Sequence, residues 1–177
     1  MKKNILLLIL LCMVCLKPAQ AQTSIEFNNQ GLTKYKAKNY AAALLDFNKA
    51  VELDAKNDKA LHNRGLAKYA LKDYEGSISD QTKAIELNPA YSNAYNDRGM
   101  VYYRQNNFAA ALKDYGKAIE IDAAYAQAYK NRAVLQYATK SYEASDKDYA
   151  KYIELKPDDA DGYMGRGSIK KIGRAHV

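Results

Sequence analysis

The chain has 177 residues, which suits one ordinary domain and is too short for two comfortable ones. Its 27 basic and 20 acidic residues give a formal net charge of +7. This mildly basic balance, without a dense basic stripe, excludes nucleic acid as the expected partner.

The first 21 residues have the pattern of an export signal. Two lysines precede an apolar run, Ile5–Leu16, and Ala19-Gln20-Ala21 has the small-x-small form of a signal-peptidase site. The run is too short to span a bilayer, so we expect a cleaved signal peptide at residues 1–21 and no stable membrane insertion after cleavage. The mature chain would be exported, periplasmic or secreted. It would keep neither cysteine, and its charge would fall to +4 because three basic residues leave with the signal.

From Ser24 onward the sequence repeats itself with a constant period and without insertions. Each unit holds two apolar-periodic segments, which predicts two helices. The first helix of the array opens with the capping-box sequence "TSIE" at Thr23. The repeating region, 22–171, consists of units 24–57, 58–91, 92–125 and 126–159 and a partial unit, 160–171. A good N-cap residue precedes an aromatic residue in the middle of each full unit, at Asn39-Tyr40, Asp73-Tyr74, Asn107-Phe108 and Ser141-Tyr142.

Small residues recur inside the first helix of each unit, where a glycine costs about 1 kcal/mol relative to alanine. They are Gly31, Gly65, Gly99, Ala133 and Gly167. Together with the recurring aromatic and alanine columns, this pattern resembles the tetratricopeptide repeat family, in its exported bacterial form. The resemblance implies an all-α fold, a right-handed α-solenoid of antiparallel helix pairs with four full repeats and a partial fifth. It also implies that each glycine lies where a facing helix approaches closely.

An arginine column and an aspartate column run through the repeats. The arginines begin in the second unit, where the first unit has Gln30, but the aspartates are complete from the first unit. Pairing each aspartate with the arginine of the next unit uses every member, so the sequence predicts ion pairs between repeats. The expected pairs are Asp46–Arg64, Asp80–Arg98, Asp114–Arg132 and Asp148–Arg166.

The resemblance further implies that the first helices line a concave groove, in which an extended peptide or a partner helix lies. Tyrosines and asparagines recur at equivalent positions of these helices, whereas cationic side chains occupy positions that differ from one unit to the next. The candidate groove residues are Asn29, Tyr35, Lys36, His62, Asn63, Tyr69, Asn96, Asp97, Tyr103, Arg104, Lys130, Asn131 and Tyr137. Recurrence in every unit favours packing over ligand contact for the tyrosines. For the column Asn29, Asn63, Asp97 and Asn131 we favour ligand contact, and the variable cations point to a mildly acidic protein or peptide.

Catalysis, metal binding and cofactor binding have no support in the sequence. The predicted mature chain has no cysteine and, apart from the histidine in its last residues, only His62. The carboxylate clamp of co-chaperone repeats is also missing. That clamp uses a Lys and an Asn on the first helix of one unit, an Asn on the next first helix, and a Lys and an Arg on the one after. At these positions this chain has Asn28 and Leu32, then Asn63, then Asn93 and Asp97, so only Asn63 fits.

The sequence therefore favours a non-catalytic protein-interaction scaffold. Two alternatives stay open: an N-terminal interaction module of a larger, truncated exported enzyme or signalling protein, and a holdase-like periplasmic chaperone. The final residues, 172–177, break the repeat and read like a translated sequencing adapter, so we expect an artefact there. We also expect end-to-end self-association through the uncapped last repeat.

Overall fold

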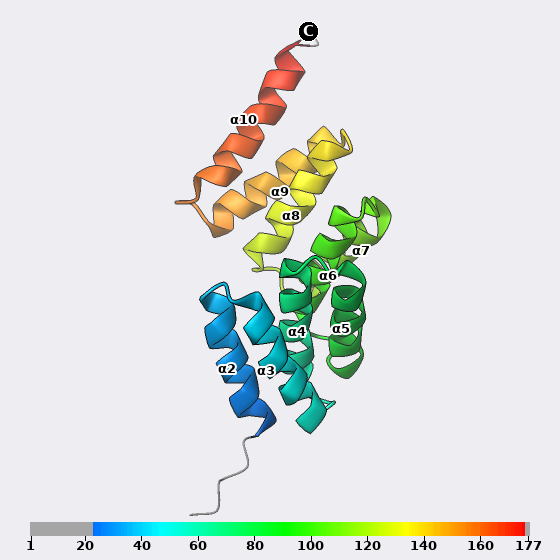
Figure 1. The fold of residues 1–177 in the computed structure, drawn as a ribbon. Helices are drawn as coiled ribbons and strands as arrows, with labels where there is room; N and C mark the ends of the chain where they lie inside the picture. The colour runs from blue at the N-terminus through cyan, green and yellow to red at the C-terminus, as the bar shows by residue number, and fades with distance from the viewer. Residues whose placement is uncertain (1–22, 176–177) are drawn as a thin grey trace, which may run out of the picture.

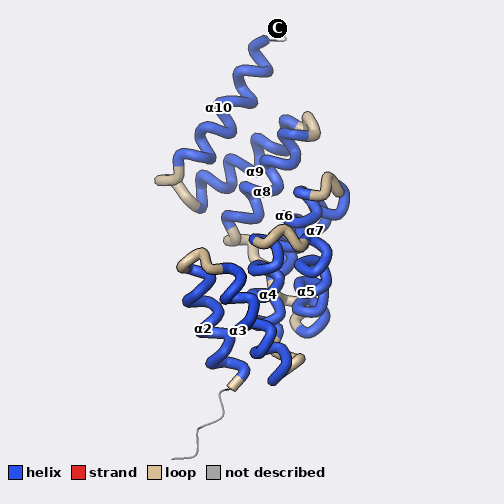
Figure 2. The backbone as a smooth tube through the Cα atoms, viewed as in Figure 1, coloured by secondary structure: helices blue, strands red, loops and turns tan. Residues whose placement is uncertain are grey.

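The computed structural model describes residues 23–175 and consists, in that range, of helices joined by short turns (Figures 1 and 2). The predicted signal peptide and the last two residues lie outside the described part. The first helix of every full unit begins at the first residue of that unit. The helices are α2 (Ser24–Lys36), α3 (Tyr40–Leu53), α4 (Asp58–Ala70), α5 (Tyr74–Leu87), α6 (Ser92–Arg104), α7 (Phe108–Ile121), α8 (Ala126–Ala138), α9 (Tyr142–Leu155) and α10 (Ala160–Ala175).

Local capping explains where most of these helices begin. Thr23 and Glu26 form the predicted capping box at the start of α2. The side chains of Asn39, Asp73 and Asn107 accept a hydrogen bond from the backbone of the residue three positions on, as predicted for the second helices. Ser141 occupies the same position before α9 but makes no such bond.

The turn between the two helices of a unit has the same backbone in every repeat. Lys38, Lys72, Asn106 and Lys140 adopt left-handed conformations with φ between 59° and 67°. Each donates its backbone N–H to the carbonyl of the tyrosine three residues earlier. The left-handed residue ends the first helix and reverses the chain, so the two helices of each unit run antiparallel.

The glycines of the first three units face large side chains of their second helices, as the sequence predicted. The expectation is wrong for Gly167, where an added Cβ would meet nothing within 4 Å, because no second helix follows α10 in the described residues. A Cβ added at Gly31 would lie 2.5 Å from a ring carbon of Phe47, and one at Gly99 would lie 2.8 Å from the ring of Tyr115. Both rings are almost fully buried, at 0% and 2% exposure. Burial of these rings, at roughly 25 cal/mol per Å² of apolar surface, offsets the poor helix propensity of glycine.

The two kinds of helix form two layers that are packed differently. Each first helix contacts the next first helix, from α2 to α4, α6, α8 and α10, whereas no two second helices contact each other within residues 23–175. Each second helix packs between its own first helix and the next one. The first helices therefore form the inner layer of the array and the second helices its outer layer, and the consecutive packing of the helix pairs confirms the predicted α-solenoid. Figure 1 shows these pairs stacked in chain order.

None of the four predicted arginine–aspartate pairs forms. Arg64 pairs with Asp80 of its own unit, with its Nε and Nη2 atoms 2.8 and 2.6 Å from the two carboxylate oxygens. The same geometry joins Arg98 to Asp114 and Arg132 to Asp148. Each of these pairs crosses from the first helix to the second helix of the same unit.

The first aspartate and the last arginine of these two series have partners that the repeat pattern did not indicate. Asp46, which has no arginine in its unit, pairs with Lys34 at 2.7 Å, one helical turn beyond Gln30. Arg166 pairs with Asp146 rather than with Asp148, whose carboxylate is already held by Arg132. This last pair joins the partial fifth unit to the fourth, whereas Arg64 and Arg98 reach the preceding unit only through their remaining nitrogen, which donates to a neutral side chain. Arg98 Nη1 donates to Thr82 at 3.0 Å in the preceding unit.

Candidate functional site

The candidate residues lie on the first helices, and we call this layer of α2, α4, α6 and α8 the inner surface. Its four tyrosines are half-buried and pack against the aromatic residue that opens the second helix of their own unit. The ring centroids are 5.1 to 5.8 Å apart in the pairs Tyr35–Tyr40, Tyr69–Tyr74, Tyr103–Phe108 and Tyr137–Tyr142. The favoured packing role is therefore present at all four positions, and ligand contact by their exposed edges stays a prediction.

The amide column joins successive first helices. Asn63 Nδ2 donates to Asn28 Oδ1 at 2.8 Å, and Asn131 Nδ2 donates to Asn96 Oδ1 at 2.9 Å. Asn28, Asn63 and Asn96 are buried, so these bonds satisfy polar groups that water does not reach. The structure thus gives these amides a role in packing, which the sequence pattern had ranked second. Asn29, in the first unit, is exposed.

The third unit has Asp97 in place of asparagine, and it binds His62. His62 Nε2 lies 2.7 Å from Asp97 Oδ2, and Nδ1 lies 3.2 Å from the hydroxyl of Tyr91. If Nε2–H donates to the carboxylate, Nδ1 accepts from the hydroxyl and both ring nitrogens are satisfied. Asp97 also accepts from Asn96 at 3.0 Å. We call the set Asn28, His62, Asn63, Asn96, Asp97 and Asn131 the polar ladder.

This arrangement makes His62 a structural group. The side chain is 7% exposed, and both ring nitrogens have a hydrogen-bond partner. Within the described residues, no three histidine, cysteine, aspartate or glutamate side chains come together as a metal site would require. Burial, followed by the charges of Asp58 and Asp97, raises the pKa of Tyr91 to about 12, so this tyrosine keeps its proton as the hydrogen-bond donor.

Of the cationic side chains that differ between units, one forms an ion pair and two are exposed. Lys130 pairs with Asp161 of α10 and lies 5.6 Å from the centre of the Tyr152 ring. Arg104 and Lys36 are exposed at the ends of α6 and α2. Arg104 donates from Nε to the hydroxyl of Tyr69 at 3.0 Å and so spans two neighbouring first helices.

A hollow of about 150 Å³ opens on the inner surface between α4, α6 and α8. It brings together candidate residues from three repeats, together with three side chains that the set of candidate residues omitted. The lining residues are Tyr69, Met100, Tyr103, Arg104, Tyr115, Asn131 and Val134. Met100 and Val134 belong to the apolar stripe of the first helices, which could have identified them. Nothing in the sequence indicated that Tyr115, from a second helix, would reach this surface.

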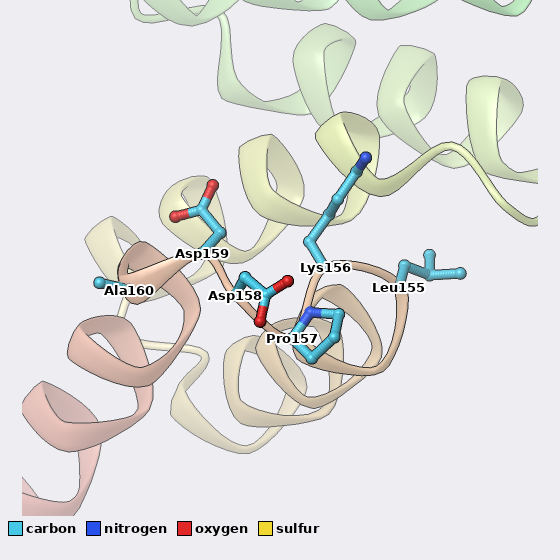
Figure 3. A pocket seen from close by; sticks show the side chains of 6 residues that line it. All are labelled: Leu155, Lys156, Pro157, Asp158, Asp159 and Ala160. Carbon is cyan, nitrogen blue, oxygen red and sulfur yellow. The ribbon is translucent and has the colours of Figure 1, made fainter.

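A larger depression of about 600 Å³ lies at the turn between α9 and α10 (Figure 3). It is lined by the consecutive residues 155–160. Because all of its side chains come from one turn and its edge, it brings no residues from distant repeats together. The hollow between α4, α6 and α8 is therefore the better candidate for a binding site.

Comparison with known proteins agrees with this architecture. The first tetratricopeptide repeat domain of Spaghetti (RPAP3), solved bound to the HSP90 peptide SRMEEVD, is 24% identical and has a TM-score of 0.64, covering 67% of this chain and 94% of that one. The structure of MamA is 21% identical with a TM-score of 0.73, covering 82% of this chain and 84% of that one. A tetratricopeptide repeat protein from Parabacteroides merdae is 24% identical with a TM-score of 0.73, covering 86% of this chain and 60% of that one. At these identities the likeness concerns the fold.

No curated protein sequence matches the chain significantly. Among the described helices, none has both the length and the apolarity needed to cross a membrane. Models of the tetratricopeptide repeat match residues 27–57, 58–91, 92–125 and 126–159. Because these matches cover most of its length, the chain belongs to the tetratricopeptide repeat family.

Proposed function

We propose that this protein is a non-catalytic scaffold that holds an extended peptide or a helix of a partner protein on its inner surface. The observation that carries the proposal is the hollow between α4, α6 and α8, to which three successive first helices contribute side chains. Such a surface reads several residues of a partner at once, because each repeat presents its own stripe. The repeat family and its peptide-bound neighbour support the same role.

The charges of this surface favour a mildly acidic partner. Arg104 and Lys36 are exposed at the ends of the first helices, and Lys38, Lys72 and Lys140 are exposed in the adjoining turns. Cations of this kind attract acidic segments and raise their association rate. The peptide bound by the Spaghetti domain, SRMEEVD, is itself acidic.

A peptide-display selection tests the proposal. Random dodecapeptides are selected on the wild-type protein and their affinities are measured by fluorescence polarisation. We expect Tyr69→Ala/Tyr103→Ala to abolish binding of the selected peptides. The matched control is Tyr74→Ala/Phe108→Ala, which removes the same two ring–ring contacts from the other side and leaves the lining of the hollow intact.

The two outcomes separate recognition from folding. Loss of binding in the first variant alone, with helix content retained in both, supports the proposal. Equal effects of the two variants, or failure of the selection to enrich any peptide, would contradict it.

Export and self-association are two further proposals. Export rests on the predicted signal peptide, and N-terminal sequencing of the secreted protein should find Gln22 first. Self-association rests on Tyr163 and Met164 of α10, which are 53% and 61% exposed. Sedimentation should detect a dimer that Met164→Lys weakens.

A further inference from the structure

The hollow between α4, α6 and α8 has a cause in the sequence. The apolar stripe of the first helices carries Leu32, Leu66, Met100 and Val134 at equivalent positions of successive repeats. Val134 is the shortest of the four, and it lines the hollow with 37% of its surface exposed. A leucine in its place would extend further toward the space that the hollow occupies.

The lining of the hollow is largely apolar. Met100 and the rings of Tyr69 and Tyr103 line it, together with Tyr115, which is 2% exposed. Apart from Arg104, the polar lining residue is Asn131, whose amide group is already bonded: it donates to Asn96 and accepts from Gln127 at 2.8 Å. An apolar cavity of this volume can hold a benzene-sized group. The lining thus suits an apolar side chain.

The rim of the hollow carries one cation with unused donors. The Nε of Arg104 is bonded to Tyr69, whereas no described residue accepts a hydrogen bond from its two terminal nitrogens. Arg104 is exposed and ends α6, so these nitrogens can pair with a carboxylate at the edge of the inner surface. Lys72 and Lys140, in the turns of the flanking repeats, are exposed along the same edge.

We propose that this hollow is a specificity subsite that takes a large apolar side chain of a partner segment, with an aspartate or glutamate beside it bound to Arg104. The inference rests on the proposed peptide-binding function and adds which residues of the partner segment the site recognises. The apolar lining selects the anchor residue, and the charge at the rim selects its neighbour. A partner segment that lacks either element loses one of these two contacts.

Two substitutions test the subsite with little risk to the fold, because each installs a residue that the protein already carries at the equivalent position of another repeat. Val134→Leu introduces the residue found at 32 and 66, and Arg104→Ala introduces the residue found at 70 and 138. The first reduces the free volume of the hollow and the second removes the rim cation. Lys83→Ala, which removes an exposed cation of α5, is the charge-matched control.

The probes are dodecapeptides selected on the wild-type protein from a random library. We expect the enriched peptides to share a leucine, methionine or phenylalanine with an acidic residue within two positions. Val134→Leu should weaken their binding about tenfold. Arg104→Ala should weaken it about fivefold at low ionic strength and less at high ionic strength, because salt screens an exposed charge pair. Lys83→Ala should leave it unchanged.

The controls separate this inference from the broader proposal. If the selected peptides lack the pattern, or bind both variants as they bind the wild type while Tyr69→Ala/Tyr103→Ala still abolishes binding, the protein is a scaffold and the subsite is wrong. If the tyrosine variant also binds normally, or no peptide is enriched, both proposals fail. Loss on Val134→Leu and salt-dependent loss on Arg104→Ala would establish the subsite.

Discussion

A double-mutant cycle on Arg98 and Asp114 tests the internal pairing of each repeat. Arg98 donates from Nε and Nη2 to the two oxygens of Asp114 at 2.8 and 2.9 Å. The side chains are 16% and 6% exposed, so solvent screens the pair weakly. Burial lowers the pKa of Arg98, but the hydrogen bonds and the charge of Asp114 outweigh burial and raise it.

The size of the effect follows from this geometry. A hydrogen bond to a charged group contributes about 1.5–3 kcal/mol net, and removing one member of a buried pair costs about 3–5 kcal/mol because the other charge stays unpaired. We expect Asp114→Ala to lower the free energy of unfolding by about 3 kcal/mol. The coupling energy between the two positions should be about 2 kcal/mol.

The decisive comparison is a second cycle on Arg98 and Asp80, the pair that the repeat pattern predicted. No ion pair joins these two residues, and Asp80 is held by Arg64 and Lys68. Their coupling energy should therefore be about 0.5 kcal/mol or less. Unfolding in urea is followed by circular dichroism and by tyrosine fluorescence, whose coincidence justifies a two-state treatment. A larger coupling to Asp80 than to Asp114 would refute the assignment.

Three further predictions concern the packing of the array, and a fourth concerns pH. Asn96→Ala, at a position that is 1% exposed, should destabilise the protein by about 2 kcal/mol in urea, because it leaves two ladder partners unsatisfied. Gly31→Ala should lower the thermal midpoint, because its Cβ would lie 2.5 Å from the buried ring of Phe47. Gly167→Ala, with nothing within 4 Å of its Cβ, should raise the midpoint, because alanine has the better helix propensity and can add up to about 1 kcal/mol to the free energy of unfolding. Burial raises the pKa of Tyr91 to about 12 in the folded protein, whereas the unfolded chain loses this proton near pH 10. The free energy of unfolding should therefore fall as pH rises from about 10 to 12, and it should fall less in Tyr91→Phe.

The sequence predicted the fold well because the signals for it are local and repeated. Most helix starts have a cap within a few residues, as at Asn39 and Asn107, and the helix crossings of the first three units place a glycine opposite a large side chain. The constant period of the repeat then places every unit in the same relation to the next. These interactions need no knowledge of distant contacts.

The ion pairs were harder to predict because the period does not show which neighbour a side chain faces. Along the chain, Asp80 lies between Arg64 and Arg98 at nearly equal separations, so pairing with either arginine repeats equally well in every unit. The choice depends on which side of the first helix carries the arginine, and the structure places it against its own second helix. The assumption that every aspartate needs an arginine overlooked Lys34.

The candidate site was predicted in outline and not in detail. The sequence placed the tyrosines and amides on the first helices, but it could not show that Asn63 and Asn131 would be used between repeats. The hollow depends on the length difference between Val134 and its equivalents and on a ring from the layer behind it. Such differences become visible only when the helices are placed side by side.

The unequal contacts of the two helix layers have a mechanical consequence. The first helices are joined to one another by direct contacts and by the polar ladder, whereas the second helices of residues 23–175 touch only first helices. Small rotations about the inner line of contacts can therefore change the spacing of the outer layer without breaking any bond between outer helices. The array should behave as a spring that coils or uncoils along its length, so that its curvature adjusts to the shape of the molecule it holds.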